Sequence, residues 1–155
     1  MPSRRSASAA ARRHIMQIRA VTHDDIDAIV DLWTRVFPEY GDPLKPQRDP
    51  RSSIERKLAF GDGLFWVGLQ GNDLAGTVMA GYDGHRGWIY SLGVDPAARR
   101  SGLGQALVAH AEAQLSARGC PKINLQVLDT NSGALAFWQS VGYEADAVLS
   151  LGKRL

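Results

Sequence analysis

Residues 94–105 read V-D-P-A-A-R-R-S-G-L-G-Q, and this stretch decides which fold the sequence predicts. A β-rich apolar run at 88–94 precedes it, and apolar side chains follow at intervals of four from Leu103 to Leu115. The expected order is therefore strand, glycine-containing turn, helix. Backbone N–H groups at the start of a helix have no intrahelical partner, so they can surround an anion. The stretch predicts a phosphate-binding turn.

Gly102 and Gly104 favour this interpretation because a residue without Cβ lets the backbone approach a pyrophosphate closely. Arg99 and Arg100 can add charge-assisted contacts. Taken alone, however, a pair of glycines favours a simpler interpretation, a turn that merely precedes a helix.

Two better-known phosphate-binding loops do not fit the sequence. A Walker loop requires Gly-Lys-Ser/Thr, which occurs nowhere in the chain. A dinucleotide loop requires a small residue where Leu107 stands and an acid near Lys122. It also opens the first βα unit of its fold, whereas residues 94–105 follow a run of predicted antiparallel strands.

The residues before this stretch predict those antiparallel strands and two helices. Gly71-Asn72-Asp73, between two β-rich runs, is typical of a hairpin. Thr22 and Asp25 have the spacing of a capping box, and the helix after them has one apolar stripe that ends at Pro38. The expected elements are a strand at 16–20, a helix at 22–37, a loop at 40–50, a helix at 51–60 and strands at 64–70, 74–82 and 88–94, the last with Trp88, Tyr90, Leu92 and Val94 on one face.

The residues after the stretch predict further elements of both kinds. A helix at 104–118 ends with Gly119 as its cap, and apolar and polar residues then alternate over 122–127 as in a strand. A helix from Asn131 or Ser132 to about 141 follows, and residues 143–155 predict one or two final strands. These elements form one domain at 16–155, and we expect residues 1–15, rich in Ser, Ala and Arg, to be a disordered tail.

Composition argues against several classes of protein. The 155 residues are 45% hydrophobic and 22% charged, as expected of one globular domain. Four arginines and no acid lie in the first 16 residues, so removing them from the formal charge of +2 leaves −2 for the folded part, which disfavours nucleic-acid binding. No apolar run reaches the roughly 18 residues of a membrane span. The single cysteine, Cys120, is typical of a reducing compartment, so we expect a cytoplasmic protein, and the histidines show no metal-ligand spacing.

Two motifs resemble those of the GNAT acyltransferases. Arg99-Arg100-Ser101-Gly102-Leu103-Gly104 matches the family's Arg/Gln-x-x-Gly-x-Gly/Ala pattern at every fixed position. Asn131, Ala134, Trp138, Gly142 and Tyr143 resemble its second signature, which usually has Asn, Ala, Tyr, Gly and Phe at these spacings. Residues 76–87, 117–123 and 148–155 further resemble the YpeA branch of the superfamily. The resemblance implies the GNAT fold, an α/β (α+β) class with a mixed, mostly antiparallel sheet, splayed central parallel strands and flanking helices.

The resemblance also implies a site for acetyl-CoA as co-substrate, without a metal. The pantetheine arm would lie between strands 88–94 and 122–127, and a backbone N–H near Val94 would stabilise the oxyanion formed when an amine attacks the thioester. The residues expected to bind the cofactor are Leu92, Gly93, Val94, Arg99, Arg100, Ser101, Gly102, Leu103, Gly104, Gln105, Asn131 and Trp138.

Catalytic and acceptor-binding residues follow from the same resemblance. Tyr90 and His85 are candidates for the base that takes the amine proton, although a core aromatic and a solvated turn are alternative interpretations. Trp138 stands where the family has a tyrosine that protonates the leaving thiolate, and a tryptophan cannot be that acid. The residues expected to contact the acceptor are Trp33, Tyr40, Asp83 and Arg86, with core packing as the alternative for Trp33.

These observations predict an N-acetyltransferase that moves an acetyl group from acetyl-CoA to a primary amine of a small molecule or a protein. The substitution at Trp138 keeps a second hypothesis open, a non-catalytic or regulatory module that binds CoA. We expect no nucleic-acid or membrane partner, and by analogy with the family we consider a homodimer.

Overall fold

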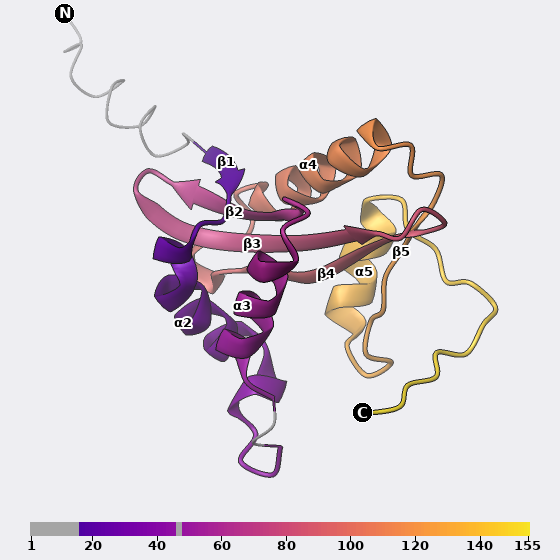
Figure 1. Ribbon diagram of the computed structural model, residues 1–155, viewed down its shortest axis with the longest axis horizontal. Helices are drawn as coiled ribbons and strands as arrows, with labels where there is room; N and C mark the ends of the chain where they lie inside the picture. Colours follow the sequence, from indigo (N-terminus) through magenta and orange to yellow (C-terminus); the bar gives the residue numbers. More distant parts are fainter. Residues whose placement is uncertain (1–15, 46–47) are drawn as a thin grey trace, which may run out of the picture.

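The computed structural model describes residues 16–45 and 48–155, so the tail expected at 1–15 lies outside the described residues. Its centre is a five-stranded sheet in the order β1-β2-β3-β4-β5 (Figure 1). The first four strands pair antiparallel with their neighbours, whereas β5 pairs parallel with β4. The expected mixed, mostly antiparallel sheet is confirmed. The strands are β1 Met16–Ala20, β2 Phe65–Gln70, β3 Asp73–Tyr82, β4 Gly87–Val94 and β5 Ile123–Asn124.

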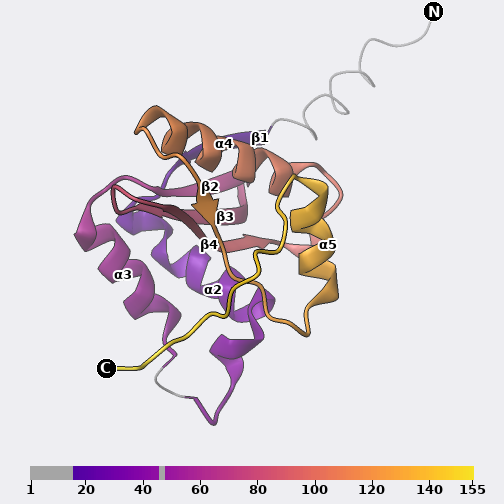
Figure 2. The same ribbon diagram turned by 90° about the vertical axis from the view of Figure 1, so that its right-hand side faces the viewer.

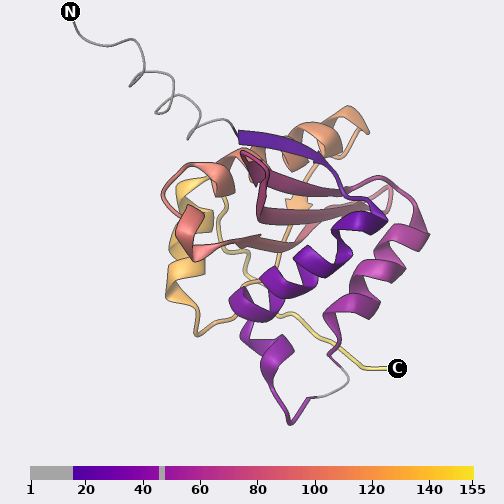
Figure 3. The same cartoon turned by 90° about the vertical axis from the view of Figure 1, so that its left-hand side faces the viewer.

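Helices cover both faces of the sheet. α4 lies over one face and α2 and α3 lie over the other, while α5 stands near the end where β4 and β5 meet (Figures 2 and 3). The four α-helices of residues 16–45 and 48–155 were all expected, and their ends differ from the expected ones by at most a few residues. The helices are α2 Ile26–Val36, α3 Pro50–Phe60, α4 Leu103–Ala117 and α5 Ser132–Ser140, with short 3-10 turns η1 His23–Asp25, η2 Pro38–Gly41 and η3 Pro96–Ala98.

The entry into α2 is fixed by the predicted pair Thr22 and Asp25. The Thr22 N–H donates to the Asp25 carboxylate at 2.8 Å, and Arg19 donates to both oxygens of that carboxylate, each at 2.8 Å. The Arg19 guanidinium is the main reason why the pKa of Asp25 lies below its usual value. This arrangement links the end of β1 to the first turn of the helix.

Two apolar clusters fill the space on either side of the sheet. The cluster on the α4 side gathers buried residues of α4, the sheet and α5, including Leu107, Val78 and Trp138. The cluster on the α2 side gathers residues of α2, α3 and the sheet, including Trp33 and Ile54. Because successive residues of a strand face opposite sides, membership in a cluster shows which face each strand residue occupies.

A β-bulge in β4 changes the face that its residues occupy. Met79 of β3 pairs with Tyr90 and Thr77 pairs with Gly93, so two residues of β4, Ser91 and Leu92, lie opposite one residue of β3. The expectation that Trp88, Tyr90, Leu92 and Val94 share one face is therefore wrong. Ile89, Leu92 and Val94 belong to the α4-side cluster, whereas Trp88 and Tyr90, stacked on each other, face the other side.

The C-terminal part of the expected sheet is also shorter than predicted. β5 pairs with β4 only at Ile123 and Asn124 rather than over 122–127, and residues 143–155 form no strand. Side-chain contacts, such as those of Lys122 with Asp146 and of Gln126 with Ser150, hold the C-terminal segment near β5. A strand requires a partner with a continuous ladder, and the two paired residues of β5 do not provide one.

We predict that Gly87→Ala destabilises the protein through one specific contact. A Cβ at position 87 would lie 2.5 Å from the Cys120 sulfur and 3.4 Å from a Leu115 methyl carbon, so something must shift. Such overpacking costs about 1–3 kcal/mol of the free energy of unfolding. Urea denaturation of Gly87→Ala, Cys120→Ala and the double variant measures the cost. The double variant should regain most of the loss, and equal destabilisation of the single and double variants would contradict the explanation.

Candidate functional site

The glycine turn brings two left-handed residues to the start of α4. Arg100 has a φ of 65° and Gly102 a φ of 85°, and Gly102 is the N-cap of the helix. A Cβ at Gly102 would meet no atom within 4 Å, so the backbone conformation and not space is what favours glycine there. The turn therefore exposes its backbone on the outside of the protein.

Backbone donors converge at this turn. The first helical bond is the one from the Ala106 N–H to the Gly102 carbonyl, and the Leu103 N–H donates to the Ser101 hydroxyl at a long 3.4 Å. Among the described residues no group accepts from the N–H groups of Gly104 and Gln105. These free donors, at the positive end of the helix dipole, suit an anion with several oxygens.

The two arginines of the turn complete this arrangement. Arg99 and Arg100 are exposed, and neither forms an ion pair with a described residue. Their charges remain free for a phosphate group. The donor set of this turn suits a pyrophosphate group.

The turn lies next to α5 and the end of β4. A Cβ at Gly104 would lie 3.4 Å from a ring carbon of Phe137 and 3.7 Å from a methyl carbon of Val94. Asn131 caps α5, because its side-chain oxygen accepts from the Ala134 N–H at 3.0 Å. Phe137, on the helix that Asn131 begins, and Val94, at the end of β4, therefore both lie beside the turn.

The gap between β4 and β5 is a divergence of two parallel strands. The strands pair at Gly87 with Ile123 and at Trp88 with Asn124, and beyond these residues the pairing stops. Apolar side chains line the α4 side of the gap, since Leu92 and Val94 of β4 and Leu125 and Val127 after β5 pack against the same cluster. The resemblance to the GNAT family implied this splay, which provides room for an extended chain between two backbones.

An open cavity borders the same gap. Its volume is about 870 Å³, and it is lined by Trp88, Leu125, Val127, Trp138 and the segment at 143–150. No residue of the glycine turn lines it. The cavity therefore opens beside β5 and α5 and is separate from the surface on which Arg99 to Gln105 lie.

The bulge orients one peptide group of β4. The Thr77 hydroxyl donates to the Ser91 carbonyl oxygen at 3.0 Å, so this oxygen faces β3. The peptide bonds of the described chain are all trans, and in a trans peptide the N–H points opposite to the carbonyl. The Leu92 N–H is therefore directed away from β3, toward the side of β4 on which β5 lies.

The two expected catalytic residues lie in different places. Tyr90 lies next to the bulge, 46% exposed, stacked on Trp88 with 6.3 Å between ring centroids. Partial burial raises the pKa of Tyr90 above its usual value, and the Asp83 carboxylate adds to this effect. A tyrosine with a raised pKa is protonated at neutral pH, so Tyr90 offers a hydroxyl and not a phenolate.

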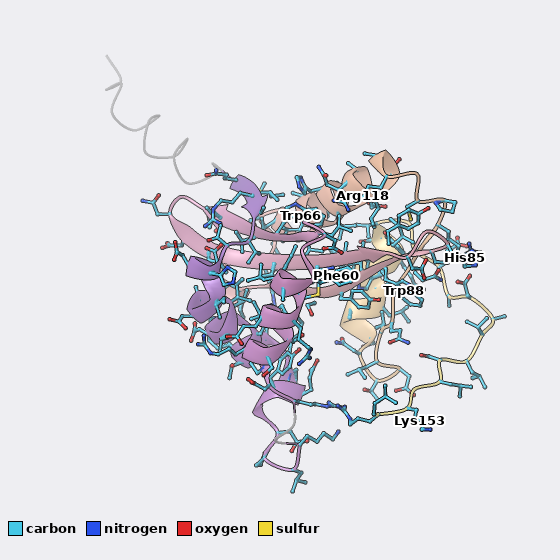
Figure 4. All side chains as sticks on the ribbon, in the orientation of Figure 1. Phe60, Trp66, His85, Trp88, Arg118 and Lys153 are labelled. Carbon is cyan, nitrogen blue, oxygen red and sulfur yellow. The ribbon has the colours of Figure 1, made fainter. Side chains whose placement is uncertain are left out.

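His85 does not reach the bulge. It lies in the turn between β3 and β4, at the end of the sheet (Figure 4), and its backbone N–H donates to the Asp83 carboxylate. Leu92 lies five positions along the strand from Gly87, about 16 Å at the usual rise. The structure does not bring His85 together with the peptide group at Leu92.

The four residues expected at the acceptor are not equally accessible. Trp33 is completely buried (0% exposed), and its indole nitrogen donates to Thr77 at 2.9 Å, so in this structure it has no surface to offer an acceptor. Tyr40 stacks on Trp33 and is partly exposed, and burial raises its pKa. Asp83 and Arg86 lie in the turn with His85, and the Asp83 carboxylate accepts the Arg86 N–H at 2.8 Å.

Trp138 belongs to the core. It is 8% exposed and lies edge-on to Phe137 and Tyr143, with centroid distances of 5.3 Å and 5.1 Å. The Tyr143 hydroxyl lies 3.3 Å from the Glu112 carboxylate, and burial together with that carboxylate raises its pKa. The aromatic group that is closest to the glycine turn is Phe137 and not Trp138.

Sequence reasoning missed three residues that shape the site, namely Thr77, Ser91 and Phe137. Thr77 had a detectable signal, because it is a polar residue within an apolar strand. Ser91 had none, since nothing in the sequence marks the left-handed φ of 49° that it adopts.

The described residues contain no group of three or more His, Cys, Asp or Glu that could hold a metal ion. In the same residues, no helix is long and apolar enough to cross a membrane.

Comparisons with known proteins agree with this geometry. The acetyltransferase (GNAT) family matches residues 26–143. Acetyltransferase SG1711 of Sodalis glossinidius (strain morsitans) is 45% identical over 141 residues, which are 90% of this chain and 96% of that protein.

Solved structures share the fold. A GCN5-related N-acetyltransferase from Ralstonia eutropha JMP134 has a TM-score of 0.69 at 26% identity, over 90% of this chain and 99% of that one. AAC(6')-Iy in complex with the bisubstrate analog CoA-S-monomethyl-acetylneamine has a TM-score of 0.72 at 18% identity, over 91% and 99%. The latter likeness concerns the fold alone. The family match, the close relative and the glycine turn beside splayed strands together show that this chain belongs to the GNAT acetyltransferases, enzymes that transfer an acetyl group from acetyl-CoA to an amine.

Proposed function

We propose that residues 99–105 hold the pyrophosphate of acetyl-CoA and that the pantetheine arm lies between β4 and β5. The observation that carries this proposal is the pair of free N–H groups at Gly104 and Gln105, next to the divergence of β4 and β5. A phosphate group at the turn and the pantetheine arm between β4 and β5 would lie on one continuous path past Phe137 and Val94.

The thioester carbonyl of this proposal lies beside Leu92. When the amine nitrogen attacks the carbonyl carbon, the carbonyl oxygen becomes negatively charged. The Leu92 N–H points to the side of β4 where this oxygen would lie, and a pre-placed donor of this kind is worth about 10²–10³ in rate. The tetrahedral species then collapses, the carbon–sulfur bond breaks and CoA leaves as a thiolate.

The acceptor amine would approach from the opposite face of β4, where Trp88 and Tyr90 lie. An amine must be neutral to attack, and a pKa of about 10.4 leaves little neutral amine at pH 7. Because Tyr90 is itself protonated, it orients the amine through its hydroxyl oxygen, and the proton leaves to water. Tyr40, Asp83 and Arg86 remain candidates for contacts with more distant parts of the acceptor.

The leaving thiolate needs no acid from Trp138. A thiol with a pKa near 8.5 can leave as an anion at modest cost and take a proton from solvent afterwards. Trp138 instead fixes α5 against the sheet, which keeps Phe137 beside Gly104. The substitution of the family's tyrosine is therefore compatible with turnover.

The acceptor class, location and assembly are further proposals. AAC(6')-Iy, which shares the fold, is described with an acetylneamine analog, and this supports a primary amine of a small molecule or a protein as the acceptor. We place the enzyme in the cytoplasm because Cys120 is a free thiol, and we infer a YpeA-like member that can form a homodimer.

Acceptor-dependent release of the CoA thiol tests the proposed function. The full chain is incubated with acetyl-CoA and a panel of amines, amino acids and peptide N-termini, and the free thiol is measured with a chromogenic disulfide. We expect turnover with at least one acceptor class and none when the acceptor is omitted. Thermal stabilisation by CoA without turnover for any acceptor would instead indicate a regulatory CoA-binding module.

We predict that Gly102→Asp weakens binding of CoA at least tenfold, because the new carboxylate repels the pyrophosphate. Tenfold corresponds to about 1.4 kcal/mol of binding free energy. Gly71→Asp is the matched control, since Gly71 has a φ of 60° and equal free space but lies in the β2–β3 turn. Calorimetric titration with CoA measures both variants. Similar losses in the two variants would show that strain and not charge is responsible.

We predict that Tyr90→Phe lowers kcat/KM about fivefold to tenfold, the value of one neutral hydrogen bond. Tyr82→Phe, whose hydroxyl donates to the Gly119 carbonyl far from the bulge, should match the wild type. The pH profile separates two roles. Because the pKa of Tyr90 is raised, kcat/KM should rise with pH toward the pKa of the acceptor amine and show no step from Tyr90 below about pH 10. A step near pH 7 that disappears in Tyr90→Phe would identify a titrating base instead.

A further inference from the structure

A buried chain of two hydrogen bonds links α2 to the bulge of β4. The Trp33 indole N–H donates to the Thr77 hydroxyl at 2.9 Å, and that hydroxyl donates to the Ser91 carbonyl oxygen at 3.0 Å. Both Trp33 and Thr77 are 0% exposed. The bond between Trp33 and Thr77 is buried, so its geometry depends on the packing of α2 on the sheet.

The position of this chain in the sheet is specific. Thr77 is the last residue of β3 that pairs regularly before the bulge, opposite Gly93, and Ser91 is the residue that the bulge adds to β4. Ser91 has a φ of 49°, a conformation that costs free energy for any residue with a side chain. Such a conformation persists only where surrounding contacts hold it, and the bond from Thr77 is the side-chain contact that Ser91 receives.

We propose that Thr77 and Trp33 are positioning residues for acetyl transfer. By holding the Ser91 carbonyl toward β3, they hold the Leu92 N–H of the same planar peptide toward the thioester. The inference rests on the proposed function, in which that N–H stabilises the oxyanion. Neither side chain touches a substrate, so both act through the peptide group between Ser91 and Leu92.

The surrounding contacts favour this role over a simple need to satisfy buried polar atoms. Trp33 stacks on Tyr40 and lies edge-on to Phe37, and Phe37 covers Gly93, where a Cβ would lie 3.0 Å from its ring. The indole is thus fixed by α2 and the residues after it. A fixed donor allows the Thr77 hydroxyl only one orientation, with its hydrogen toward Ser91.

The variants Thr77→Val, Thr77→Ser and Trp33→Phe separate positioning from packing. Thr77→Val keeps the shape and removes both bonds, and Thr77→Ser keeps the hydroxyl. Trp33→Phe removes the indole donor together with part of the buried ring. We expect kcat to fall by about 10- to 100-fold in Thr77→Val, below the full loss of an oxyanion donor because the peptide remains present. Thr77→Ser should stay within about threefold of the wild type, and Trp33→Phe should be intermediate.

A spectroscopic readout tests the orientation of the donor directly. The carbonyl stretch of [1-¹³C]acetyl-CoA bound without acceptor should be lower in the wild type than in water, because the Leu92 N–H polarises the carbonyl. The shift should be largely lost in Thr77→Val and retained in Thr77→Ser. The dissociation constant for CoA should stay within about threefold in all variants, since the glycine turn is unchanged.

Ile54→Ala is the control for general loosening. Ile54 lies on α3, is 0% exposed and belongs to the same α2-side cluster, but it is outside the hydrogen-bond chain. It should lower the melting temperature at least as much as Thr77→Val and leave kcat and the carbonyl frequency unchanged at 25 °C.

The outcomes are distinct. Wild-type kcat and carbonyl frequency in Thr77→Val, or equal losses in Ile54→Ala, overturn the positioning role and leave the proposed function intact. Absence of both turnover and a carbonyl shift in the wild type overturns the two together. If Thr77→Val does not fold, Trp33→Phe decides, because a carbonyl frequency and kcat equal to those of the wild type contradict the inference.

Discussion

The bulge at Ser91 and Leu92 is the constraint on which the arrangement of the site depends. One extra residue in β4 makes Tyr90 face α2 and Leu92 face α4, although regular alternation would give them the same face. In the proposed function, the opposite faces of this single strand therefore serve the two reactants. In the proposed arrangement, the thioester carbonyl and the amine meet at the peptide group where the change of face occurs.

The two apolar clusters support this division in different ways. On the α4 side, Leu103 and Leu107 pack so closely against β2 and β3 that a Cβ at Gly68 or Gly76 would lie within 3.0 Å of one of them, which fixes the start of α4 and hence the glycine turn. On the α2 side, the aromatic residues after Trp33 cover Gly93 and hold the buried hydrogen bonds. Each cluster thus sets one half of the site, and β4 is their common element.

The sequence predicted those parts of the structure that depend on local signals. The helices, the hairpin at Gly71 and the glycine turn follow from periodicity, caps and residues of unusual backbone freedom. The bulge could not be predicted, because the side chain that donates to Ser91 lies 14 residues away in the sequence. Trp33 was expected to contact the acceptor by analogy with the family, whereas its apolar stripe predicted burial. Nothing in the sequence predicted that its indole nitrogen would donate to Thr77. One or two strands at 143–155 were predicted from local sequence. Their formation also depends on how far β5 continues, and β5 ends at Asn124.

The bulge also divides β4 into two parts with separate constraints. Residues 81–90 precede the change of face, and the turn among them has hydrogen bonds of its own, from the backbone N–H groups of His85 and Arg86 to the Asp83 carboxylate. The pairing of Thr77 with Gly93 lies on the other side of the bulge from that hairpin end. In the proposed function, this exposed hairpin belongs to the acceptor side, and the bulge separates it from the end of β4 that faces the cofactor.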